Sequence, residues 1–154
     1  MVRPVCSSTR LGPRHSGRVF GGTMTLANIR DSVAARLPAR YDHLKLTFYG
    51  KESRLQGEYV VIGDDYGTNL CARLNDGSIY SIDPQRRLET CFVNSSIEQL
   101  ARFIEASESF AGTTLDNESL ARGMQAALAA IDDRAFTESP NWWGQVLEGV
   151  SRGL

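Results

Sequence analysis

Apolar residues first recur at helical spacing directly after Thr25. The four that share one face of the predicted helix are Leu26, Ile29, Val33 and Leu37. The Thr25 hydroxyl is suited to accept a hydrogen bond from a free N–H of the first turn, as an N-cap does. Pro38 disfavours helical backbone at the residue before it. The pattern therefore predicts a first helix that begins after Thr25 and ends at Pro38.

The next part of the chain has the two-residue period and the β-branched and aromatic content of strands. Five segments share this character and are predicted to be strands: 43–50, 58–63, 68–74, 78–83 and 90–93. Residues 50–57 are predicted to form a turn or loop. Asp64 to Gly67 has turn chemistry, and Asp76-Gly77 is the strongest hairpin signal in the chain.

The last part of the chain returns to helical spacing. Ser95 and Glu98 form a predicted capping box, and apolar residues follow it on one face up to residue 104. Two more helices are predicted over residues 117–131 and 142–150. A leading helix, then strands, then helices predict an α+β domain. We expect a mostly antiparallel sheet of about four to six strands packed with helices, within a single domain over residues 24–154.

Residues 1–23 differ from the rest of the chain. They are rich in Arg, Gly, Pro and Ser, and they show neither a helical nor a strand period. We expect either a disordered leader or translation that begins at Met24. The segment lacks the apolar core of about 7 to 15 residues that a secretory signal needs, so we expect a cytoplasmic protein.

The net charge of −1 hides an uneven distribution. From Asp31 to the end, 12 basic residues stand against 18 acidic ones, a net charge of −6. Nucleic acid binding needs clustered Lys and Arg, so this part of the chain is predicted to meet a basic partner and no nucleic acid. No apolar run approaches the roughly 20 residues that span a bilayer, so no membrane contact is predicted.

Few residues suggest chemistry. The chain has two histidines, His15 and His43, so Ser95 and Ser96 lack an obvious base and are interpreted as helix caps. Four aspartates near the turns match no calcium loop: Asp64, Asp65, Asp76 and Asp83. The three cysteines lack zinc-site spacing. We therefore predict no catalytic residue, metal or cofactor.

Adjacent tryptophans are the other notable feature. Because neighbouring helical residues point about 100° apart, we expect one of Trp142 and Trp143 in the core and the other to be partly exposed. Asp132 and Asp133 are predicted to lie on a solvated helix surface. The candidate residues for partner binding are Asp64, Asp65, Tyr66 and Trp142.

Several of these segments together resemble the SUKH superfamily, most closely its fourth branch of bacterial immunity proteins. The resemblance covers most of residues 37–150. The residues that carry it are Leu37, Pro38, Gly63, Gly67, Asp76, Gly77, Asn94, Ser95 and Trp143. It implies an antiparallel α+β domain that neutralises a toxin in the producer's cytoplasm without catalysis. The shared positions would then serve as turn, cap and core residues.

Three functions follow from these observations. The leading one is an immunity protein that binds a cognate toxin, possibly one directed at nucleic acids, because the acidic chain would imitate the charge of that substrate. The second is a general interaction or scaffold module without a toxin partner. The third is a small enzyme or ligand-binding domain around Asp64, Asp65 and Tyr66, which would require a deep pocket beside that turn.

Overall fold

The computed structural model describes residues 23–86 and 90–154. The predicted leader up to residue 22 lies outside the described residues. Helix α1, Leu26–Arg36, begins as predicted, since the Thr25 hydroxyl accepts a hydrogen bond from the Asn28 backbone N–H at 3.1 Å. The helix ends at Arg36, before Leu37, and its Ile29 and Val33 side chains are buried.

Seven antiparallel strands form one sheet in the described part of the chain. They are β1 (Arg40–Tyr41), β2 (Leu46–Phe48), β3 (Arg54–Gln56), β4 (Tyr59–Asp65), β5 (Thr68–Arg73), β6 (Ile79–Ile82) and β7 (Thr90–Asn94). The strand order in the sheet is β1-β2-β4-β5-β6-β7. Strand β3 lies outside this order and pairs with β4. The α+β, mostly antiparallel architecture is confirmed, with two short strands that the pattern did not predict, β1 and β3.

The first predicted strand is shorter than expected. Residues 42–45 form the turn between β1 and β2, and Lys45 has a φ of 58°. Residues 50–57 are not only loop, because they include the 3-10 helix η1, Gly50–Glu52, and strand β3. All three residues of β3 are exposed, so the segment carries no apolar alternation that would identify it as a strand.

Strand β4 continues through both aspartates that were assigned to a turn. Asp65 pairs with Thr68, so the turn to β5 contains only Tyr66 and Gly67. Gly63 lies where the β4–β5 register shifts, and a Cβ atom there would be 2.3 Å from the Thr47 carbonyl oxygen. Only glycine lets β2 approach β4 this closely.

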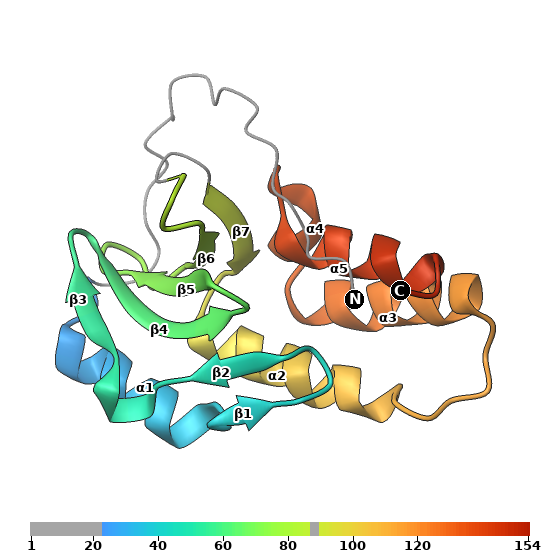
Figure 1. Cartoon of the computed structure of the whole chain (residues 1–154), viewed down its shortest axis with the longest axis horizontal. Coiled ribbons are helices and arrows are strands. Elements are labelled where there is room, and N and C mark those ends of the chain that lie inside the picture. The colour runs from blue at the N-terminus through green and yellow to red at the C-terminus, as the bar shows by residue number, and fades with distance from the viewer. Residues whose placement is uncertain (1–22, 87–89) are drawn as a thin grey trace.

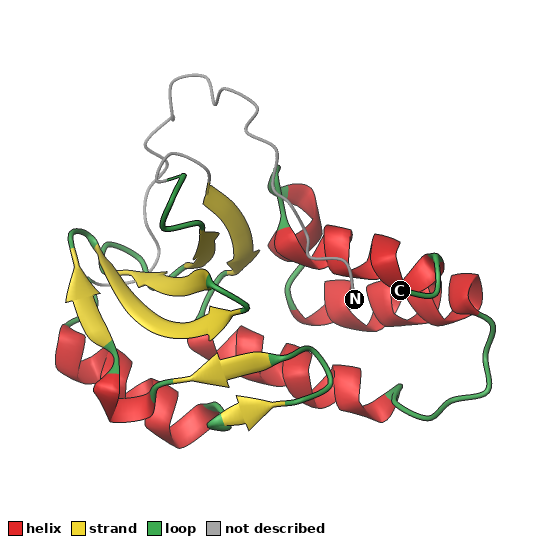
Figure 2. Cartoon of the chain, viewed as in Figure 1, coloured by secondary structure: helices red, strands yellow, loops and turns green. Residues whose placement is uncertain are grey.

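Four helices follow the sheet: α2 (Ile97–Ser109), α3 (Asn117–Ile131), α4 (Arg134–Thr137) and α5 (Trp142–Ser151). Figure 1 shows α1 and α2 along one side of the sheet, while α3, α4 and α5 lie together beyond its β7 end. Figure 2 shows helices on these two sides of the strands. We call α3, α4 and α5 the C-terminal helices.

Candidate functional site

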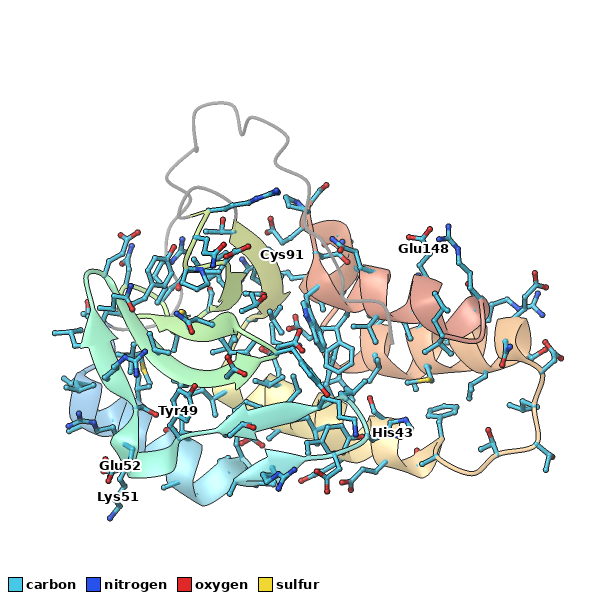
Figure 3. The ribbon with its side chains drawn as sticks, viewed as in Figure 1. His43, Tyr49, Lys51, Glu52, Cys91 and Glu148 are labelled. Carbon is cyan, nitrogen blue, oxygen red and sulfur yellow. The ribbon has the colours of Figure 1, made fainter. Side chains whose placement is uncertain are left out.

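A groove with a volume of about 660 Å³ lies between two turns of the sheet and helices α3 and α5. Two turns form its sheet side, the β1–β2 turn with His43, Leu44 and Lys45 and the end of β4 with Asp65 and Tyr66. Its helical side is mostly apolar and includes Leu120, Trp142, Val146 and Val150. Figure 3 shows His43 at the β1–β2 turn, where this hairpin reaches toward α3 and α5.

A hydrogen bond between Trp142 and Asp65 closes the inner wall of the groove. The Trp142 indole Nε1–H donates to Asp65 Oδ2 at 3.1 Å, and the two residues are only 3% and 7% exposed. The Trp142 ring also meets the Trp143 ring edge to face, with centroids 4.8 Å apart. Both tryptophans are therefore buried, and the expectation that one of them is partly exposed is wrong.

Tyr66 stands at the rim of the groove in an unusual backbone conformation. Its φ is 48° and that of Gly67 is 90°, as a two-residue hairpin turn with positive φ at both positions requires. A bulky residue rarely adopts positive φ, because its Cβ approaches the following carbonyl oxygen. The Tyr66 side chain is 53% exposed.

The residues proposed for partner binding are only partly brought together. Asp65, Tyr66 and Trp142 all line the groove. Asp64 does not, and its carboxylate instead accepts the Gly67 N–H at 3.0 Å and so fixes the turn. Sequence reasoning missed His43 and Lys45, whose turn was assigned to a strand. Val146 and Val150 of α5 also line the groove.

A buried polar network lies behind the tryptophans. Asn94 Oδ1 accepts the Trp143 Nε1–H at 2.9 Å, and the Asn94 amide donates to Asp132 Oδ2 at 3.1 Å. Asp132 also accepts the Ser95 N–H at 2.8 Å and the Ser95 hydroxyl at 2.9 Å. Asp132 is 4% exposed, so its predicted place on a solvated surface is wrong.

The same network changes the assignment of the helix cap. Because Ser95 bonds to Asp132, the N-cap of α2 is Ser96, whose hydroxyl accepts the Gln99 N–H at 3.2 Å. The predicted capping box of Ser95 and Glu98 is therefore wrong by one residue. Ser95 instead holds the end of β7 to the C-cap residue of α3, Asp132.

The remaining motif residues form turns and core away from the groove. Leu37 is buried where α1 ends, and Pro38 follows it at the surface. Gly77 has a φ of 77°, which confirms its turn position in the β5–β6 hairpin. Burial would raise the pKa of Asp76, but hydrogen bonds from Arg73 and Ser78 outweigh it and lower that pKa from 3.8 to about 2.

The described residues supply little else for chemistry. Within residues 23–86 and 90–154, no group of three or more His, Cys, Asp or Glu side chains is placed to hold a metal ion. None of the described helices combines the length and hydropathy needed to cross a membrane. The arrangement offers an apolar groove with one buried carboxylate, a geometry suited to recognition.

A family model described as SUKH-4 immunity protein matches residues 33–149. The matched range contains the sheet, the buried polar network and most of the groove. Comparisons with curated proteins and with solved structures found no significant match.

Proposed function

Because the chain belongs to the SUKH-4 immunity protein family, we propose that it binds a cognate bacterial toxin and neutralises it without catalysing a reaction. The family match over residues 33–149 is the observation that carries this proposal. The toxin would be blocked in the cytoplasm of the cell that makes it, before the toxin is exported. The groove beside Tyr66 supports a role in recognition, since it combines apolar surface with a polar anchor.

We further propose that the toxin is basic and acts on nucleic acids. From Asp31 onward the chain carries a net charge of −6, which attracts a basic surface and imitates the charge of a nucleic acid. Toxins that cut or modify nucleic acids need such a basic surface to hold phosphates. The acidic chain would therefore compete with the substrate and accelerate the encounter with the toxin.

Co-expression with the toxin domain encoded beside this gene tests the proposal. The two proteins are expected to co-purify as a complex, and cells that express the toxin domain are expected to survive only with the immunity protein. Purified toxin should lose its nuclease or other activity when the complex forms. If cells are not protected and no complex forms, while a protein of another operon binds, the chain is a scaffold module instead.

A ligand-binding domain is the second candidate, and the groove lined by Asp65 and Tyr66 is the observation that supports it. Thermal unfolding in the presence of a metabolite library separates this function from toxin binding. A ligand that binds only the folded state raises Tm in a concentration-dependent manner. A saturable rise that Tyr66→Asn abolishes, without any protection against the toxin, would favour the ligand-binding domain.

A further inference from the structure

We propose that residues 40–45, which comprise β1 and the turn after it, form a strap that opens and closes at the groove while β2 stays in the sheet. We call residues 40–45 the β1 strap. Its turn supplies His43, Leu44 and Lys45 to the sheet side of the groove, so the position of the strap determines how wide the groove is. The inference concerns the protein alone and goes beyond the question of which partner it binds.

Few backbone hydrogen bonds hold the β1 strap. Strand β1 is the outermost strand of the sheet (Figure 1), and it pairs with β2 at only two positions. Within the described residues, no strand pairs with its outer edge. In the turn, the Lys45 N–H donates to the Asp42 carbonyl oxygen over 3.3 Å, which is long for this kind of bond. The strap therefore has less backbone support than the longer strands of the sheet.

Strand β2, the other half of the hairpin, is attached more firmly. It pairs with β4 at three positions, and its Leu46 and Phe48 side chains are buried in the core. Gly63 of β4 lies opposite Phe48 and lets the two backbones come close together. The boundary between a weakly held and a firmly held segment thus falls between Lys45 and Leu46.

The Tyr41 hydroxyl makes the closed position of the strap costly. Tyr41 is only 4% exposed, and its hydroxyl has no hydrogen-bond partner in the described part of the chain. A hydroxyl buried in this way has lost its bonds to water without replacing them. Burial, and after it the nearby Glu108 carboxylate of α2, raise the pKa of Tyr41 to about 12. When the strap opens, the hydroxyl regains water as a partner.

Lys45 is placed to act as the hinge. Its φ is 58°, a left-handed conformation that is unfavourable for a residue with a Cβ atom, and its side chain is exposed. Hinges are residues at the ends of elements whose φ and ψ change during a movement. Because Lys45 joins the strap to β2, its backbone can relax when the strap moves away.

Two apolar contacts oppose this opening. The Tyr41 ring and the Leu44 side chain are both buried, whereas the Arg40–Asp42 ion pair has side chains that are 76% and 78% exposed and so contributes little. A segment held by so few contacts opens locally, at a much smaller free energy than global unfolding. The open form offers a protein partner the apolar surface that Tyr41 and Leu44 bury in the closed form, and a partner that uses it shifts the population toward that form.

Hydrogen exchange of the full-length protein, followed by mass spectrometry, tests the strap. Peptides that cover residues 40–45 are expected to have protection factors at least about 100-fold lower than peptides from β4 and β5. Tyr41→Phe keeps the ring and removes the hydroxyl, so it is expected to raise the protection of the strap at least about 5-fold. Tyr49→Phe, at the partly exposed tyrosine directly after β2, is the matched control and is expected to change it less than about 2-fold.

A second pair of variants tests the hinge. Asn tolerates positive φ better than Lys, so Lys45→Asn is expected to stabilise the closed strap and raise its protection about 3-fold or more. The control is Lys51→Asn, the same change at an exposed lysine of η1 that has an ordinary φ. We expect it to alter the protection of the strap less than about 2-fold.

Each result supports or overturns the inference without reference to a toxin. If the strap of the unaltered protein is as protected as β4, it opens only when the whole protein unfolds and the inference is overturned. It is also overturned if folded Tyr41→Phe leaves the protection of the strap unchanged, since opening then does not expose Tyr41. Equal effects of the two lysine variants would remove Lys45 as the hinge. A protein that neutralises no toxin could still show the expected pattern, so the failure of this inference and that of the proposed function are distinguishable.

Discussion

Asp132 shows how much one carboxylate can contribute to this fold. It accepts hydrogen bonds from the Asn94 side chain and from the backbone and hydroxyl of Ser95, and it is almost fully buried. Asn94 in turn accepts the Trp143 indole N–H. The network therefore joins the end of β7 to the C-terminal helices, and its bonds satisfy the buried polar groups of Asn94, Asp132 and Trp143.

Asp132→Ala is expected to lower the free energy of unfolding by about 3 kcal/mol, because it leaves the Asn94 amide and the Ser95 N–H without their acceptor. Urea unfolding followed by circular dichroism measures the change. The neighbouring Asp133→Ala removes an exposed carboxylate and is expected to cost less than about 0.5 kcal/mol. Equal losses for the two variants would contradict the role assigned to the network.

The β5–β6 hairpin illustrates stabilisation within one element. Asp76 accepts the Arg73 Nε–H at 3.1 Å and the Ser78 backbone N–H at 3.0 Å, and a second Arg73 nitrogen pairs with its other oxygen. The Arg73 guanidinium also lies over the Tyr80 ring, 5.0 Å from its centroid. The turn, the ion pair between Arg73 and Asp76, and the contact between Arg73 and Tyr80 thus stabilise the same hairpin.

This hairpin predicts a pH dependence of stability. The pKa of Asp76 is about 2 in the folded protein and 3.8 ordinarily, so folding favours the charged carboxylate. Its contribution is complete above about pH 5 and is lost as the pH falls toward 2. Asp76→Asn is therefore expected to cost on the order of 2 kcal/mol at pH 7 and only a few tenths at pH 2.

Urea unfolding of both proteins from pH 2 to pH 7 measures this difference. Asp31→Asn, an exposed substitution of the same chemistry, serves as the control and is expected to show a small difference at every pH. A cost for Asp76→Asn that stays constant over the whole range would show that the charge of Asp76 does not stabilise the hairpin.

At the scale of the whole molecule, several contacts join the sheet to the C-terminal helices. They include the Asp65–Trp142 hydrogen bond, the network around Asp132, and the hydrogen bond from the Phe92 backbone N–H to the Pro140 carbonyl oxygen at 3.0 Å. Together they hold α5 against the sheet, beside the groove. The helical side of the groove is therefore formed before binding, which lowers the entropic cost of association.

The net charge predicts how complex formation responds to salt. If an acidic protein meets a basic toxin, the association rate constant is expected to fall about 10-fold between 20 mM and 300 mM salt, because ions screen the long-range attraction. The dissociation rate constant is expected to change much less, since contacts at the interface determine it. Surface plasmon resonance at several salt concentrations measures both constants, and an association rate that is independent of salt would contradict charge steering.

Local patterns in the sequence were sufficient for most of the longer elements and for the fold class. The positions of α1, α3 and α5, the β5–β6 hairpin and the antiparallel α+β architecture follow from apolar periods, caps and turn residues. These features depend on neighbouring residues, so they can be predicted without knowledge of distant contacts. Short strands such as β3 were missed because three exposed residues carry no period.

The tertiary structure decided what the polar residues do. Ser95 and Ser96 each have an acceptor or donor side chain three residues later, Glu98 and Gln99, so local sequence cannot select the N-cap of α2. Ser95 bonds to Asp132, which lies 37 residues further along the chain, and Ser96 is therefore the N-cap. In the same way, the groove exists because Trp142 meets Asp65 across 77 residues of sequence. Local sequence patterns do not record such distant pairings, and only folding brings these partners together.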